Sequence, residues 1–187
     1  MTFAFMDKYP YVLCKEITEL SDLERLNISK HAVEQYNSKF NVKERNGYNV
    51  KLERIPELQK LWDIFEEYCI REFSNVAILK TDRYRDCWAY IQNSDQGFSV
   101  WHTHVFTATI NAVYYANLPD KSATLSIINN DGEEKEVFIK ENYLYLFPGW
   151  MLHKPNEQKM SKKPRISINL ELLTLTRPIH DSTNIMW

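Results

Sequence analysis

Three histidines stand where they could share one metal ion. His102 and His104 are separated by one residue, and His153 follows the turn signal Pro148-Gly149. In a strand, residues i and i+2 point to the same face, so His102 and His104 can aim at one point. If an early and a late strand lie side by side, as in a jelly roll, His153 completes a face of three imidazoles. A lone histidine is more often structural, but this grouping favours a divalent metal with positions open for substrate and oxygen, as in non-haem iron centres.

Arg165 and Ser167 form a second pair with chemical potential, two residues apart in a strand-like run. On one face of a strand, a guanidinium and a hydroxyl would make a planar, bidentate clamp for a carboxylate. An arginine that points into a barrel is costly unless it pairs with an anion. The alternation also permits the opposite orientation, in which Ile166 and Ile168 face the core and Arg165 faces solvent. The sequence leaves both orientations open.

The first part of the chain is mainly helical. Residues 20–36 have a helical pattern, with Ser21 and Ser29 as alternative N-caps. The clearest helix begins at Pro56, a typical first-turn proline. One apolar stripe follows at helical spacing and is typical of packing on a sheet; it consists of Leu58, Leu61, Trp62, Phe65, Cys69 and Phe73.

The rest of the chain is rich in short β-prone runs. A first strand is expected at residues 11–16, and later strands at 77–79, 88–92, 98–103, 109–117, 123–129, 136–140, 143–147 and 165–174. Asn130-Asp131-Gly132 is the best hairpin signal. The predicted class is α+β and β-rich: a jelly roll with N-terminal helices packed on one sheet. We expect a single domain over residues 1–187, with a helical elaboration at 1–75, a jelly-roll catalytic core at 76–176 and a tail at 177–187.

Composition excludes several classes of protein. A 13% aromatic fraction and a net charge of −2 argue against disorder and give little support to nucleic-acid binding. The one basic cluster, at residues 159–165, is more typical of a turn. Three cysteines without a CxxC pattern indicate reduced thiols, and neither a signal peptide nor a membrane-spanning run is evident. We therefore predict a cytoplasmic location, away from the membrane, with the oligomeric state left open.

Cupins are the main rival among jelly-roll metalloproteins. Their first motif places five residues between a glycine and HxH, whereas four separate Gly97 from His102 here. Threonine and alanine occupy residues 107–109, where the cupin glutamate would stand. Their second motif places two residues between P-x-G and histidine, whereas three separate Gly149 from His153. Both cupin motifs are missed.

The stretch from Trp88 to Leu172 resembles the 2-oxoglutarate/Fe(II)-dependent oxygenases. The branch that it is most similar to is a small bacterial and phage one, related to prolyl and aspartyl/asparaginyl hydroxylases. Residues 146–153, Leu-Phe-Pro-Gly-Trp-Met-Leu-His, are similar to "LFPSWLxH" of that branch. Residues 102–104 followed by Val-Tyr-Tyr at 113–115 resemble "HxHP…SGVYY", and residues 165–168 match "RISI".

The resemblance implies roles for these residues. His102 and His153 would bind Fe(II), while Arg165 and Ser167 would hold the distal carboxylate of 2-oxoglutarate. Position 104 is where much of the superfamily has an Asp or Glu ligand, so His104 implies a three-histidine centre or a different third ligand. A neutral ligand leaves the iron more positive and weakens its retention. Val105 in place of proline, and Asn-Ala at 111–112 in place of Ser-Gly, are further departures.

The expected activity is hydroxylation of an aliphatic carbon with 2-oxoglutarate and O2, giving succinate and CO2. The substrate would be a small molecule or a peptide, first of all a peptidyl or free amino acid. The alternatives are a non-catalytic jelly-roll module that binds metal or is structural, and a cupin-like dioxygenase or isomerase that does not use 2-oxoglutarate. Four aromatic residues are predicted as pocket walls, although each also suits the core: Tyr90, Trp101, Tyr115 and Trp150.

Overall fold

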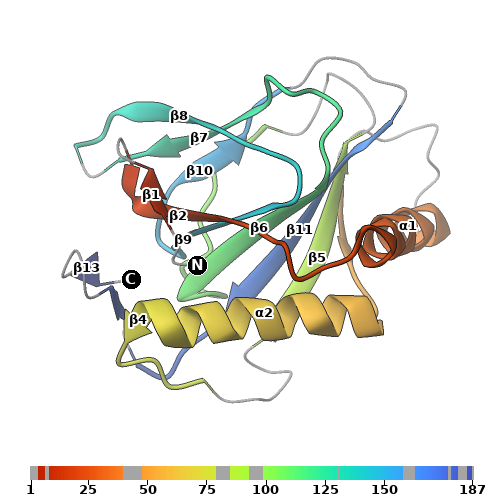
Figure 1. The fold of residues 1–187 in the computed structure, drawn as a ribbon. Helices are drawn as coiled ribbons and strands as arrows, with labels where there is room; N and C mark the ends of the chain where they lie inside the picture. Colours follow the sequence, from red (N-terminus) through yellow and green to blue (C-terminus); the bar gives the residue numbers. More distant parts are fainter. Residues whose placement is uncertain are drawn as a thin grey trace.

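The computed structural model describes residues 4–6, 9–39, 48–78, 85–92, 99–129, 131–157, 163–176, 178–180 and 185–186. Figure 1 shows one large sheet with two helices on one side and a smaller sheet on the other. The large sheet has the order β1 (Ala4–Met6), β2 (Tyr9–Glu16), β9 (Tyr143–Pro148), β6 (Ile110–Asn117), β11 (Arg165–Leu172), β5 (Arg85–Gln92) and β3 (Tyr48–Lys51).

Two smaller sheets complete the fold. The one that faces the large sheet has the order β10 (His153–Pro155), β7 (Thr124–Ile128) and β8 (Glu134–Phe138). The other has the order β13 (Ile185–Met186), β12 (Ile179–His180) and β4 (Phe73–Ser74). Paired strands run antiparallel in every pairing between the described strands.

Alternation along the central strands separates two cores. Ile166 and Ile168 of β11 belong to the core beneath the helices. Val113 and Tyr115 of β6 face the other way and pack with Leu125 of β7 in a core between the two sheets. Because successive residues of a strand point to opposite faces, both faces of the large sheet are buried. The predicted jelly roll, with helices packed on one of its sheets, is confirmed.

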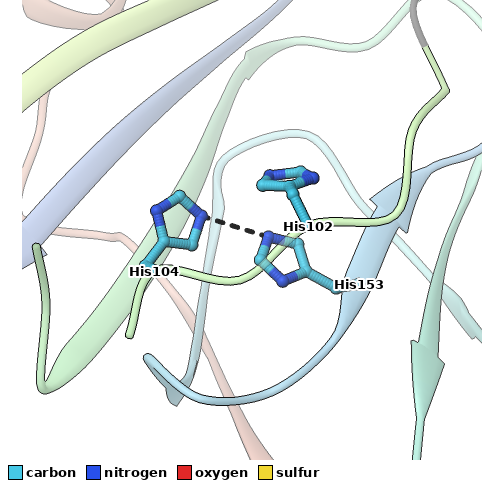
Figure 2. A group of neighbouring side chains, drawn as sticks. All are labelled: His102, His104 and His153. Atoms are coloured by element: carbon cyan, nitrogen blue, oxygen red, sulfur yellow. Dashed lines mark hydrogen bonds between the residues drawn. The ribbon is translucent and has the colours of Figure 1, made fainter. Parts of the chain in front are cut away.

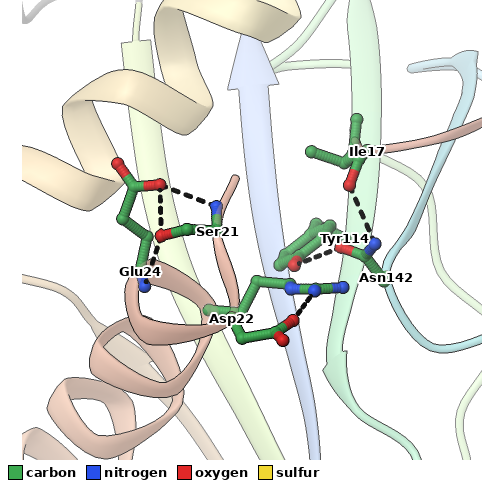
Figure 3. A network of polar contacts seen from close by, with 7 residues as sticks. Ile17, Ser21, Asp22, Glu24, Tyr114 and Asn142 are labelled. Atoms are coloured by element: carbon green, nitrogen blue, oxygen red, sulfur yellow. Dashed lines mark hydrogen bonds and ion pairs between the residues drawn. The ribbon is translucent and has the colours of Figure 1, made fainter. Parts of the chain in front are cut away.

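The two helices, α1 (Asp22–Lys39) and α2 (Pro56–Glu72), begin as the sequence predicts. Before α1, the Ser21 backbone N–H donates to Glu24 Oε2 at 2.7 Å and the Glu24 N–H donates to Ser21 Oγ at 3.3 Å, a reciprocal capping box (Figure 3). Ser29 is not an N-cap, since it lies inside α1 and its hydroxyl donates to the Ala116 carbonyl at 3.3 Å. Within the described residues, neither helix is long and apolar enough to cross a membrane.

Asn142 ties the segment before α1 to the jelly roll (Figure 3). Its backbone has φ of 66°, in the left-handed region that asparagine tolerates better than most residues. Its side-chain amide donates to the Ile17 carbonyl at 2.8 Å and accepts from the Tyr114 hydroxyl at 2.9 Å. These bonds join three chain segments: the end of β2, the middle of β6 and the turn before β9.

Most of the expected strands are present, including the first one, which lies within β2. The expected runs from residue 88 to 92 and from 109 onward correspond to β5, β6, β7, β8, β9 and β11, and β7 and β8 pair as the predicted hairpin, with Gly132 at φ 78°. Residues 77–78 and 99–103 form no strand, and β3, at Tyr48–Lys51, was not expected. Leu79, Phe98 and Asn130 lie outside the described residues, and the boundaries at residues 75 and 176 stay a prediction.

Candidate metal centre

The three histidines singled out by spacing converge on one point (Figure 2). His102 and His104 lie in the loop between β5 and β6, and His153 begins β10. One ring nitrogen from each lies within 4.8 Å of the others. The Nε2 atoms of His104 and His153 are 3.3 Å apart, and these two rings are buried while His102 is exposed.

Backbone pairing brings the two histidine segments together. His102 and His153 exchange N–H···O bonds of 3.0 Å in both directions, and the His104 N–H donates to the Gly149 carbonyl at 2.7 Å. A Cβ atom on Gly149 would lie 1.9 Å from the Ala108 carbonyl oxygen. Only glycine therefore lets the turn before β10 approach the loop after His104 this closely.

His102 and His153 are held in the same way. The Nδ1 of each lies 2.9 Å from the carbonyl oxygen two residues earlier, that of Val100 and that of Met151. A carbonyl only accepts, so each Nδ1 carries the proton and each Nε2 keeps a free lone pair. Partial desolvation of its ring lowers the pKa of His102, and full burial holds the pKa of His153 well below its usual value. Both rings are therefore neutral at pH 7, the form that binds metals.

His104 is held by an acid that the sequence did not single out. Its Nδ1 contacts the carboxylate of Glu171, a β11 residue that is 1% exposed, and Trp88 stacks on its ring with centroids 5.7 Å apart. The period of the strand could have identified Glu171. This residue continues the alternation of Arg165, Ser167 and Asn169 along the face of β11 that turns toward the second sheet.

A cavity of about 280 Å³ opens beside the histidines. Its walls come from both sheets and from the histidine segments, and consist of Trp88, Tyr90, His102, His104, Val113, Tyr115, Leu125, His153, Pro155, Arg165, Ser167 and Asn169. Of the four predicted aromatic walls, Tyr90 and Tyr115 line the cavity. Trp101 and Trp150 do not: Lys154 Nζ covers the Trp101 ring at 4.5 Å, and Trp150 is 42% exposed.

Arg165 points into this cavity, not to solvent, and is 1% exposed. Its Nη1 donates to the Asn156 carbonyl at 3.2 Å and its Nη2 to the Tyr115 hydroxyl at 3.5 Å, while Nε has no hydrogen-bond partner among the described residues. None of the carboxylates in the described ranges forms an ion pair with it. A buried cation without an anion is costly, so the cavity suits an anionic ligand.

Ser167 lies beside Arg165 on the same wall, as the alternation requires. It is 5% exposed, and its hydroxyl donates to the Tyr90 carbonyl at 3.4 Å, near the limit for a hydrogen bond. The structure therefore brings together the histidine cluster and the Arg-Ser pair in a single cavity.

No family model matches the chain, and no curated protein matches it in sequence. Its fold is similar to that of a prolyl-4-hydroxylase from Pseudomonas putida, with a TM-score of 0.60 and 13% identity over 86% of this chain and 91% of that one. It is similar to a prolyl hydroxylase from Trichoplax adhaerens in complex with a hypoxia inducible factor peptide, with a TM-score of 0.65 and 15% identity over 87% and 83%.

A third similar structure is HygX from Streptomyces hygroscopicus with nickel and 2-oxoglutarate bound, with a TM-score of 0.61 and 9% identity over 86% of this chain and 81% of that one. At these identities the likeness concerns the fold. The chain thus has the fold of the 2-oxoglutarate/Fe(II) oxygenases, as the motif resemblance predicted, and the roles of its residues rest on the geometry above.

Proposed function

We propose that the protein is a 2-oxoglutarate- and Fe(II)-dependent oxygenase that hydroxylates an aliphatic carbon. The observation that carries the proposal is that three converging imidazoles and one unpaired buried arginine share a cavity. Converging histidines alone would suit a structural metal, and a buried arginine alone would suit many anions. Together they offer ligands for a metal and an anchor for a carboxylate on the same co-substrate.

His102, His104 and His153 are the proposed metal ligands. With Nδ1 of His104 and of His153 directed at oxygen atoms, their Nε2 lone pairs face each other at 3.3 Å. Two such lone pairs repel unless a cation lies against both, so the residues fit a divalent metal. When bound, iron with 2-oxoglutarate and O2 supplies the oxidising power that protein side chains lack.

Arg165 and Ser167 are the proposed anchor for the distal carboxylate of 2-oxoglutarate. The unpaired Nε and the weak 3.5 Å bond from Nη2 leave the guanidinium free to turn toward an anion in the cavity. Burial raises the pKa of Tyr115, so its hydroxyl stays protonated and able to donate beside the same carboxylate. Val113 and Leu125 give the cavity apolar walls that exclude water and strengthen the ion pair.

The proposed substrate is a peptidyl or free amino acid, or another small molecule. The loop that carries His102 and His104 exposes three apolar side chains: Val100 by 47%, Val105 by 53% and Phe106 by 93%. Exposed apolar residues next to a ligand site add binding surface for an apolar part of the ligand. They lie within a few residues of the metal ligands, so they favour a substrate with an apolar portion that extends beyond the cavity.

The test is anaerobic addition of Fe(II) and then 2-oxoglutarate to the metal-free protein, followed by O2. We expect a visible metal-to-ligand charge-transfer band and then succinate. His153→Ala, checked for folding by circular dichroism, should lose both because it removes a ligand. Metal binding without band or succinate would identify a non-catalytic module, and O2 consumption that does not require 2-oxoglutarate would identify a cupin-like enzyme; either result contradicts the proposal.

A further inference from the structure

The acid at the metal centre lies behind a histidine instead of on the metal. Non-haem iron oxygenases commonly use two histidines and one carboxylate, whereas the three converging side chains here are neutral imidazoles. The carboxylate of Glu171 is nevertheless close, in contact with Nδ1 of His104, on the side of the ring away from His153. A negative charge is therefore present one side chain further from the metal position.

We propose, building on the proposed function, that Glu171 is a positioning residue that replaces the missing carboxylate ligand. Its acceptor oxygen keeps the proton of His104 on Nδ1, so that Nε2 faces the metal. Its charge is transmitted through the imidazole and strengthens metal binding. Carboxylates that orient metal-binding histidines act in this way, and their loss weakens metal affinity about 10- to 100-fold.

Among the described residues, the contact with His104 is the one ion-pair contact that Glu171 forms. Glu171 is 1% exposed, and its Oε2 has no hydrogen-bond partner among the described residues. Arg165 lies on the same face of β11 but six residues away, about 20 Å at the rise of a strand, too far to neutralise it. A buried carboxylate needs a positive charge nearby, and a metal bound to Nε2 of His104 would supply one.

Asn111 lies next to Glu171 on the neighbouring strand β6. It is opposite Glu171 in the β6–β11 pairing, is fully buried, and has both side-chain polar atoms without a partner in the described part of the chain. Directly opposite residues share a face, with Cβ atoms about 5 Å apart. The Asn111 amide is therefore placed to donate to Glu171 Oε2, which would hold the carboxylate against His104.

The test compares Co(II) affinity by calorimetry, and the visible Co(II) spectrum, in wild type, Glu171→Gln and Glu66→Gln. Glutamine keeps an oxygen that accepts from His104 Nδ1 but removes the charge. We expect Glu171→Gln to weaken Co(II) binding about 10- to 100-fold and to shift the spectrum. Glu66, a buried acid on α2 away from the cavity, is the matched control and should leave both unchanged.

A second background separates charge from folding. His104→Ala removes the imidazole through which Glu171 is proposed to act, and leaves His102 and His153 for residual Co(II) binding. Adding Glu171→Gln to His104→Ala should therefore cause little further loss of Co(II) affinity, in contrast to its effect in wild type. A purely structural role would give a loss in both backgrounds, and wild-type affinity in Glu171→Gln would also overturn the inference. If wild type itself bound no metal, the proposed function would fail first.

Discussion

Replacing Arg165 with methionine should weaken 2-oxoglutarate binding strongly while changing the stability of the folded protein only modestly. An arginine that is 1% exposed would ordinarily be structural, and its removal would cost several kcal/mol. Here the guanidinium has one good hydrogen bond, 3.2 Å to the Asn156 carbonyl, and one marginal bond of 3.5 Å to Tyr115. Methionine fills much of the same volume without a charge.

The expected change in the free energy of unfolding is smaller than the expected loss of 2-oxoglutarate binding energy. Losing the hydrogen bonds costs about 1–3 kcal/mol, and removing the unpaired Nε and a buried uncompensated cation returns a similar amount. The free energy of unfolding should therefore change by less than about 2 kcal/mol in either direction. A bound carboxylate that loses its buried partner costs about 2–5 kcal/mol, which is roughly a 30- to several-thousand-fold loss of affinity.

Urea unfolding of the metal-free protein and anaerobic calorimetry with 2-oxoglutarate measure these two quantities. Arg71→Met is the matched control, since Arg71 lies on α2, is 43% exposed and pairs with Glu72 at 3.4 Å. It should leave 2-oxoglutarate affinity unchanged. A methionine variant at 165 that unfolded several kcal/mol more easily yet bound 2-oxoglutarate normally would show that Arg165 is structural and that the clamp assignment is wrong.

Two further substitutions test how the chain positions the site. Gly149→Ala should lower metal affinity and the free energy of unfolding by about 1–3 kcal/mol, because the new Cβ would lie 1.9 Å from the Ala108 carbonyl oxygen. Gly132→Ala is the control, since Gly132 has φ 78° and nothing lies within 4 Å of a Cβ there. It should cost about 1–2 kcal/mol of stability through backbone strain and leave Co(II) binding unchanged. Equal Co(II) affinity in both variants would argue against the close approach at Gly149. Ser21→Ala should lower the free energy of unfolding by about 1 kcal/mol through loss of the capping box, without changing Co(II) affinity. An unchanged urea midpoint would show that the capping box does not stabilise α1.

The sequence predicted those features that depend on local pattern. The α2 stripe and the long strands carry a clear period, and the histidine pair carries its spacing, so each could be read from neighbouring residues. β3 was missed because its four residues are held by pairing with β5, a contact that their own polar composition does not indicate. The 99–103 run has strand-like composition but only one bridge pair, His102 with His153.

Long-range contacts account for the part of the site that sequence could not predict. Glu171 and His104 are 67 residues apart, and no local pattern joins them. The inward orientation of Arg165 depends on which face of β11 the helices cover. Ile166 and Ile168 are buried against the helices, and this directs the polar residues that alternate with them, Arg165, Ser167 and Asn169, toward the cavity.

The unsatisfied polar side-chain atoms of the described interior lie on β11 and on its two neighbouring strands, β5 and β6. Among the described residues, the buried side-chain atoms without a hydrogen-bond partner belong to Gln92, Asn111, Arg165 and Glu171. These are two cross-strand pairs, Arg165 with Gln92 at the start of β11 and Glu171 with Asn111 near its end. Folded proteins rarely leave such atoms unpaired unless a ligand or water completes them. Under the proposed function, Arg165 would pair with the anionic co-substrate, and Glu171 would act on the metal through His104.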